Sequence, residues 1–152
     1  MQDNVPQAAS ACAEAQNRQF DRASQLENRR YVALTPEEWV RQQFTRFLTD
    51  HKGYPPALMV NEMEHTANGK KRRCDSVVFN AKGTPLVIIE YKAPSISITQ
   101  KVFEQLSSYN IILHTKYLIA TNGMNHYCCR VDYEAKSFSF LRDIPNYQEL
   151  EQ

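Results

Sequence analysis

Two carboxylates and a lysine fall close together within residues 69–94, whose sequence is GKKRRCDSVVFNAKGTPLVIIEYKAP. The apolar runs CDSVVF and PLVIIEY flank the polar, glycine-containing NAKGT, which is the pattern of a β-hairpin. Asp75 lies inside the first run, and Glu90 and Lys92 stand at the end of the second. Because side chains alternate along a strand, Glu90 and Lys92 share one face and Tyr91 takes the other. If the hairpin register brings Asp75 alongside, two carboxylates and an ammonium meet at one point, where they could hold a metal ion and a reactive water.

This combination of residues suits the hydrolysis of a phosphodiester bond, which requires charge neutralisation at the phosphate and an activated water. Asp75 and Glu90 are suitable oxygen ligands for Mg²⁺, for which Mn²⁺ can substitute, and the main-chain carbonyl of Tyr91 adds a third oxygen. Lys92 could orient the attacking water or stabilise the developing negative charge. Two structural alternatives stay open: Asp75, with Arg73 two residues before it, could form a cross-strand ion pair, and Glu90 with Lys92 could be a solvated strand end.

A basic cluster stands next to Asp75 and consists of Lys70, Lys71, Arg72 and Arg73. The formal net charge of the whole chain is only +1, so a nucleic-acid partner is indicated by this local cluster and not by the overall charge. We expect the cluster to contact DNA phosphates without reading base sequence. The near-neutral chain should bind DNA weakly by itself, which leaves room for a partner that delivers the substrate.

Other chemistries lack their sequence signatures. The chain has no GxxxxGK[ST] phosphate loop and no local signature of a Ser/His/Asp or Cys/His nucleophile. No two of the histidines have metal-ligand spacing such as HxxxH, so we expect surface or structural roles for His51, His65, His114 and His126. The four cysteines form no CxxC pair, and we expect reduced, structural thiols at Cys12, Cys74, Cys128 and Cys129.

The length of 152 residues allows one domain with a proper core. Residues 1–30 are polar and rich in Gln, Asn and Ala, which predicts a loosely packed arm, and residues 31–152 should form the domain. No stretch approaches the roughly 18 apolar residues of a membrane span, and the N-terminus lacks a basic start followed by an apolar run. We therefore expect a soluble, cytoplasmic protein without a membrane partner.

A helix should open the domain in the segment LTPEEWVRQQFTRFL. Thr35 is a good N-cap, Pro36 suits the first helical position, and Glu38 completes a capping box. At about 100° per residue, Glu37 falls on the flank of the apolar stripe and could look toward the sheet, whereas Glu38 points nearly opposite. The alternative is that both glutamates merely favour the positive end of the helix dipole. The stripe itself consists of Val40, Phe44, Phe47 and Leu48.

The remaining elements follow in the order strands, helix, strands. LMVNEME should be a first strand, followed by a turn at HTANGK and then by the hairpin. A helix is expected over about residues 99–113, in which Gln105 and Tyr109 lie one turn apart and can reach the same place. KYLIAT, HYCCRVDY and KSFSFL read as further strands. The sum is an α/β (α+β) domain with a central mixed sheet flanked by helices.

Together these residues resemble the PD-(D/E)xK nuclease superfamily. Asp75 followed by Glu90-Tyr91-Lys92 is similar to its D…ExK core, and Gln105-Leu-Ser-Ser-Tyr109 is similar to the QxxxY motif of its RecB-like branch. More narrowly, the segments TPEEWVRQ, RRCDSVVF, VIIEYKAP, QLSSYN and LIATNG resemble the N-terminal nuclease domain of type I restriction enzyme R subunits, in a small stand-alone form. The resemblance covers about residues 31–147.

The resemblance implies a restriction-endonuclease-like fold and magnesium-dependent cleavage of DNA, expected to be double-stranded. Asp75 and Glu90 then correspond to metal ligands and Lys92 to the catalytic lysine. Glu37 corresponds to the acidic residue of the first helix, and the implied accessory pair is Gln105 and Tyr109. The chain departs from the family pattern at Cys74, where a proline usually precedes the Asp, and it is too short to contain the translocating motor of a full R subunit.

Three functions stay open at this point. The leading hypothesis is a Mg²⁺-dependent DNA endonuclease, acting with other subunits of a restriction-modification or DNA-processing complex. The second is a non-catalytic nucleic-acid-binding or assembly module that retains the nuclease fold. The third is an RNA-directed nuclease, which would use the same residues.

Overall fold

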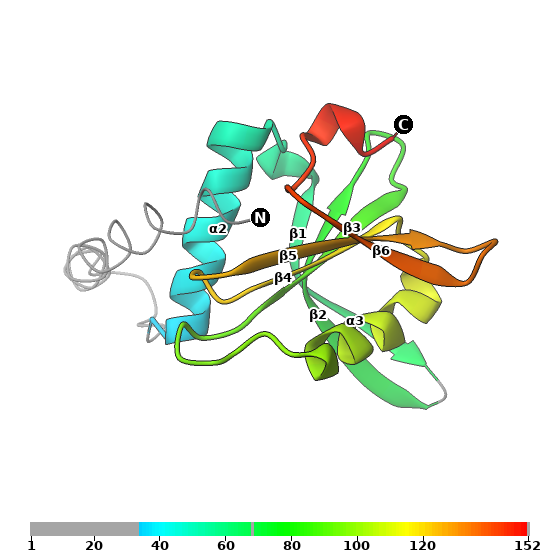
Figure 1. The fold of residues 1–152 in the computed structure, drawn as a ribbon, viewed down its shortest axis with the longest axis horizontal. Coiled ribbons are helices and arrows are strands. Elements are labelled where there is room, and N and C mark those ends of the chain that lie inside the picture. Colours follow the sequence, from blue (N-terminus) through cyan, green and yellow to red (C-terminus); the bar gives the residue numbers. More distant parts are fainter. Residues whose placement is uncertain (1–33, 68, 152) are drawn as a thin grey trace.

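The computed structural model describes residues 34–67 and 69–151 (Figure 1). The predicted arm over residues 1–30 lies outside the described residues. The elements follow in chain order as α2 (Pro36–Lys52), η1 (Pro56–Leu58), β1 (Met59–Ala67), β2 (Lys70–Phe79), β3 (Pro85–Tyr91), α3 (Gln100–Leu113), β4 (Tyr117–Thr121), β5 (His126–Asp132), β6 (Ser137–Leu141) and η2 (Tyr147–Glu149). None of the helices among these residues is long and apolar enough to cross a membrane.

The strands form one six-stranded sheet in the order β1-β2-β3-β4-β5-β6. β3 and β4 run parallel, joined by the crossover helix α3, and all other neighbours are antiparallel. The predicted mixed sheet is therefore confirmed. Helices α2 and α3 cover opposite faces of this sheet, which gives three layers (Figure 1).

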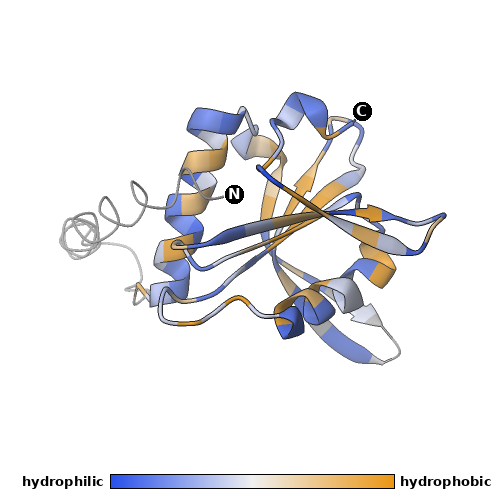
Figure 2. Cartoon of the chain, in the orientation of Figure 1, coloured by the Kyte–Doolittle hydropathy of each residue, from blue (hydrophilic) through white to orange (hydrophobic). Residues whose placement is uncertain are grey.

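The centre of the sheet is apolar on both faces, and Figure 2 shows this concentration of hydrophobic residues in its inner strands. Alternate residues of β3 enter the two cores: Val87 and Ile89 pack on the α2 side, and Ile88 packs on the α3 side. A strand buried on both faces needs a nearly continuous apolar run, which is what PLVIIEY supplies. Glu90 is the one ionisable carboxylate in this run, so it ends up buried with the strand.

Helix α2 begins where the sequence predicts. The side chain of Thr35 accepts a hydrogen bond from the backbone N–H of Glu38 at 3.1 Å, and Pro36 occupies the first turn. Gly53 ends the helix at a left-handed φ of 73°, a conformation that costs glycine little. The Glu38 carboxylate does not complete the predicted capping box with the Thr35 backbone, because it bonds to the side chains of Arg41 and Gln42.

The prediction for the turn before the hairpin was wrong in extent. Thr66 pairs with Lys71 and Glu64 with Arg73, so most of HTANGK and the whole basic cluster belong to strands β1 and β2. Gly69, with a φ of 74°, is the turn residue that the structure describes before Lys70. Ladder hydrogen bonds are made by the backbone, so exposed strand residues need not be apolar. The Asn-Gly pair in the sequence is a signal for a short connection between two strands.

Candidate functional site

Asp75 sits where strands β2 and β3 separate. Their last regular pair is Ser76 with Ile89, and beyond it the Asp75 carboxylate accepts a hydrogen bond from the backbone N–H of Tyr91 at 2.9 Å. The side chain thus replaces a ladder bond at the end of β3. Because the N–H and C=O of one strand residue point to the same edge, the Tyr91 carbonyl also faces the Asp75 side.

Glu90 projects into the same place and is nearly buried, at 5% exposure. Its Oε1 lies 3.5 Å from the Nζ of Lys92. Its Oε2 is buried and has no hydrogen-bond partner among the described residues. Burial raises the pKa of Glu90 to about 7, with the Asp75 charge adding to the shift and Lys92 opposing it. Burial also raises the pKa of Asp75, against the effects of the Tyr91 N–H and of Lys92.

This donor set fits a hard divalent cation. A buried carboxylate oxygen without a partner, beside a second carboxylate, is an electrostatic cost that a bound cation would relieve. The described residues contain no group of three His, Cys, Asp or Glu side chains that could hold a metal ion, so the protein ligands would be two carboxylates and a carbonyl. Mg²⁺ commonly keeps several waters and binds through one or two carboxylates, so this small set suits it.

Gln105 and Tyr109 reach the same region from helix α3. The Gln105 amide donates a hydrogen bond to the Tyr109 hydroxyl at 2.8 Å, as their spacing of one turn allows. Burial raises the pKa of Tyr109, and the charges of Glu90 and Asp75 contribute to the shift. The phenol therefore lies close enough to both carboxylates to feel their field, and the pair forms the wall of the site on the α3 side.

The two glutamates of helix α2 differ from the sequence-based expectation. Glu37 is exposed near the start of α2. Glu38, expected to point nearly opposite the apolar stripe, is half-buried in an ion pair with Arg41, which holds the pKa of Glu38 below its usual range. Their i, i+3 spacing was the available signal for this pair.

Sequence reasoning also missed two polar clusters around the site. On the α2 face, the Tyr91 hydroxyl donates to Ser76 Oγ at 2.9 Å, and Ser76 Oγ donates to Asn61 at 2.6 Å. Beyond β4, the Asn122 amide donates to the Ile96 carbonyl at 2.7 Å and so ties down the loop that follows Lys92. The Asn-Gly dipeptide at 122–123 indicated a turn but not this long-range bond.

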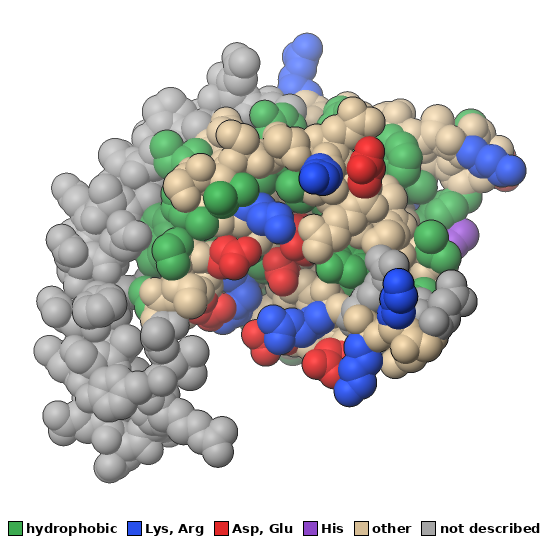
Figure 3. Space-filling model, turned by 90° about the horizontal axis from the view of Figure 1, so that it is seen from below, with side chains coloured by type: hydrophobic (Ala, Val, Ile, Leu, Met, Phe, Trp, Pro, Cys, Tyr) green, Lys and Arg blue, Asp and Glu red, His purple; other side chains and the backbone are tan. Residues whose placement is uncertain are grey.

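The basic cluster lies on the outer half of β2. Lys70, Lys71 and Arg73 are exposed, and the positive charge of Arg73 is near enough to lower the pKa of Asp75. Nothing is described for the side chain of Arg72. Figure 3 shows acidic and basic side chains gathered on one face of the molecule. A chain of phosphates could contact lysines and arginines there.

The cysteines and His126 have structural positions. Cys74, Cys128 and Cys129 are buried and free, as predicted. Burial raises the pKa of the Cys74 thiol to about 12, with the charges of Glu90 and Asp75 adding to the shift, so this thiol stays neutral beside the site. His126 is hydrogen-bonded to Thr121 at 2.6 Å, and burial lowers its pKa to about 4.

Comparisons with known proteins agree with this architecture. A solved fragment assigned to an HsdR subunit of a type I restriction enzyme from Vibrio vulnificus YJ016 superposes with a TM-score of 0.58 at 21% sequence identity. The match covers 78% of this chain and 25% of that one, so the present chain spans about a quarter of its length. None of the curated proteins compared with this chain matches it. The family model described as type I restriction enzyme R protein N terminus matches residues 36–145, more than half of the sequence, and the chain therefore belongs to that family.

Proposed function

We propose that this protein is a metal-dependent nuclease that hydrolyses phosphodiester bonds in DNA. The observation that carries the proposal is the buried, unpartnered Oε2 of Glu90 beside Asp75, with Lys92 3.5 Å from the other Glu90 oxygen. Membership in the R-protein N-terminal family supports a nuclease role, and the D…ExK and QxxxY pattern supplies the specific residues.

The metal would be Mg²⁺, with Mn²⁺ as a substitute, held by Asp75, Glu90 and the main-chain carbonyl of Tyr91. Such an ion supplies charge neutralisation at the phosphate and a water of lowered pKa. The Tyr91 N–H fixes the Asp75 carboxylate, so one ligand is oriented before any ion binds. Lys92, with its side chain 23% exposed, can still reach solvent and orient a water or a phosphate oxygen.

The remaining residues would contact the substrate or shape the site. Gln105 and Tyr109 offer N–H and O–H donors toward a phosphate on the α3 side. Lys70, Lys71, Arg72 and Arg73 would contact phosphates farther along the DNA, since β2 carries them away from Asp75. Glu37, exposed at the start of α2, would act only at the margin of the site, so we expect its substitution to matter less than that of Asp75.

The proposed substrate is double-stranded DNA, and the proposed setting is a complex. The solved relative is a fragment about four times longer than the matched region. A net charge of +1 also gives the chain little long-range attraction for DNA. Other subunits of a restriction-modification or DNA-processing complex are therefore proposed to bring the substrate to this domain.

Cleavage assays with linear, circular and single-stranded DNA, and with RNA, test the proposal. Wild type should cut DNA with Mg²⁺ or Mn²⁺ and not with EDTA, whereas Asp75→Asn and Lys92→Ala should lose at least about a hundredfold in rate. Lys116→Ala, at an exposed lysine that precedes β4, is the matched control and should cut like wild type. Equal cutting by all variants, or none by concentrated wild type, would overturn the proposal, and preferred cutting of RNA would reassign the substrate.

A non-catalytic nucleic-acid-binding or assembly module is the second candidate. It is favoured by the absence of a third His, Cys, Asp or Glu ligand among the described residues. Such a module would bind DNA equally well with Mg²⁺ and with EDTA, and Asp75→Asn would not change its affinity. Substituting Lys70, Lys71 and Arg73 together should weaken binding and flatten its salt dependence in either case.

A further inference from the structure

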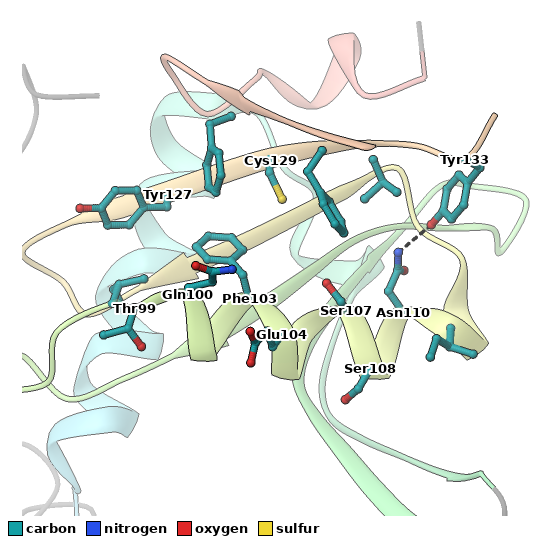
Figure 4. Close-up of a pocket in the computed structure, with 15 residues that line it drawn as sticks. Thr99, Gln100, Phe103, Glu104, Ser107, Ser108, Asn110, Tyr127, Cys129 and Tyr133 are labelled. Carbon is teal, nitrogen blue, oxygen red and sulfur yellow. Dashed lines mark hydrogen bonds between the residues drawn. The ribbon is translucent and has the colours of Figure 1, made fainter. Parts of the chain in front are cut away.

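Among the described residues, strand β6 is an edge of the sheet, and it borders an apolar groove of about 1110 Å³ (Figure 4). The groove lies between α3 and the strands β5 and β6, because α3 packs mainly on β2, β3 and β4 and meets the outer two strands through the ring of Phe103. Phe138 and Phe140 form its outer wall and are 53% and 60% exposed. Neither Asp75 nor Glu90 lines this groove, so the candidate nuclease site does not account for it.

The same two phenylalanines turn their backbone groups away from the other described strands. The N–H of Val131 donates to the Lys116 carbonyl, so Val131 turns its backbone toward β4. Because alternate residues of a strand turn their N–H and C=O to opposite sides, Arg130 and Asp132 turn theirs toward β6, where they pair with Ser139 and Ser137. Phe138 lies between these two serines and Phe140 follows the second. By the same alternation, both phenylalanines point their N–H and C=O groups away from the sheet.

The two edges of the sheet differ in how they discourage pairing. The opposite edge, β1, carries Glu62 and Glu64, and Glu62 adopts a left-handed φ of 56° that disturbs a flat edge. Charges and irregular backbone are the usual protection of edge strands. β6 reads SFSFL and has no charged residue and no proline. Its backbone geometry and its composition therefore both favour addition of another strand.

We propose that β6 is a self-association surface on which the β6 strand of a second copy of this chain pairs. The pairing would be antiparallel about a two-fold axis at Ser139, so that Phe138 of one copy lies opposite Phe140 of the other. In this register the outward N–H and C=O groups of both phenylalanines meet their counterparts, and the rings form cross-strand aromatic pairs on the groove face. The Phe-Ser-Phe segment is symmetric about Ser139, so a two-fold axis there sets each phenylalanine opposite the other, which is why a second copy of this strand fits the edge.

The apolar area indicates a weak dimer. A phenylalanine side chain buries about 200 Å², so the exposed fractions of Phe138 and Phe140 leave roughly 230 Å² of apolar surface per copy. Stable interfaces bury about 800 Å² per partner, of which this pair of rings with the strand edge supplies only a part. Association should therefore depend on concentration.

Sedimentation velocity on the metal-free full chain, without DNA, tests the surface independently of any nuclease activity. Over a series from about 1 µM to about 300 µM, the wild-type mass should rise from one chain toward two. Phe138→Lys and Phe140→Lys should each stay at the mass of one chain, because they place like charges across the two-fold axis. Phe138→Lys is the more informative of the two, since Phe140 also packs on Phe103, with ring centroids 5.2 Å apart.

Ile111→Lys is the matched control. Ile111 is 81% exposed on α3 and lines the same groove, but it does not belong to the strand edge. This variant should associate like wild type. A wild-type chain that stays monomeric throughout the series overturns the proposal. Dimers that Ile111→Lys abolishes and Phe138→Lys does not would also overturn it, by placing the interface on the helix.

Discussion

At the scale of single residues, the pair Asp75 and Glu90 is costly in the metal-free protein. Burial raises both pKa values, the charge of Asp75 adds to the shift of Glu90, and one Glu90 oxygen has no hydrogen-bond partner among the described residues. The Tyr91 N–H and the Lys92 ammonium offset only part of this cost. A protein keeps such an arrangement most readily where a bound cation completes it.

The first prediction concerns the stability of Asp75 variants in EDTA. Asp75→Asn keeps an oxygen that can accept the Tyr91 N–H and removes a charge beside Glu90, so its free energy of unfolding should equal or exceed that of wild type. Asp75→Ala leaves that N–H without its acceptor and should lose about 1.5–3 kcal/mol. Urea denaturation followed by circular dichroism measures both. A large loss for Asp75→Asn would instead favour the structural ion pair with the nearby Arg73.

The second prediction concerns pH. The folded protein holds a proton on Glu90 up to about pH 7, whereas an unfolded chain loses it near the ordinary pKa of 4.5. Between these values the folded state binds more protons, so the free energy of unfolding of the metal-free protein should fall as pH rises from 4.5 to about 7. Glu90→Gln should remove this pH-dependent fall in the free energy of unfolding. Denaturation curves of both proteins at several pH values in EDTA measure it.

His126 changes the free energy of unfolding with pH in the opposite direction, so its effect must be separated from that of Glu90. Its pKa is lowered from 6.5 to about 4, so the folded state binds fewer protons between these values and stability should rise with pH there. Subtracting the free energy of unfolding of Glu90→Gln from that of wild type at each pH cancels the His126 contribution, because both proteins contain His126. If the free energies of unfolding of the two proteins changed with pH in parallel, the raised pKa of Glu90 would be contradicted.

At the scale of elements, the sequence was informative where a residue pattern is compatible with only one local structure. The run PLVIIEY predicted a strand buried on both faces, and Thr35 with Pro36 predicted the start of α2. The hairpin of CDSVVF and PLVIIEY brings Asp75 to the end of β3, although its side chain bonds to the Tyr91 backbone and not to a facing charge.

Features set by tertiary contacts were not predictable in this way. Helical periodicity indicated that Glu37 could look toward the sheet, but Glu38 is the half-buried residue, and its carboxylate bonds to the side chains of Arg41 and Gln42. The polar residues 65–67 and 70–73 were not predicted as strand from their own pattern, yet they belong to the paired strands β1 and β2. No local pattern reveals that Asn122 reaches the loop at Ile96.

The third prediction concerns that loop, which joins Lys92 to α3. Asn122 is 3% exposed, its amide donates to the Ile96 carbonyl, and its oxygen accepts from the backbone of Met124 and Asn125. Asn122→Ala should lower the free energy of unfolding by about 1–3 kcal/mol and speed hydrogen exchange in residues 93–98. Asn125→Ala is the control, since only the backbone of this exposed residue takes part. Unchanged exchange in the Asn122 variant would mean that the loop is held by other contacts.

At the scale of the whole molecule, two cores share one sheet. The core on the α2 face runs from Trp39 to Leu150 in sequence, and the core on the α3 face runs from Cys74 to Cys129. Each core therefore draws on residues far apart in the chain, and the family match over residues 36–145 covers most of both. The candidate site lies where β3, buried in both cores, reaches its end.

The fourth prediction concerns the segment before helix α2. Among the described residues the two cores lie within 34–150, so a chain that starts at residue 31 retains all the packing described for the sheet and both helices. Its free energy of unfolding should differ from that of the full chain by less than about 1 kcal/mol, because the sequence of residues 1–30 is polar and offers few apolar side chains to a core. Thermal denaturation of the two chains in the same buffer measures this, with Trp39→Ala as a variant that removes core packing and should unfold far more easily. If the shortened chain lost as much stability as Trp39→Ala, residues 1–30 would have to be counted as part of the domain and not as an arm.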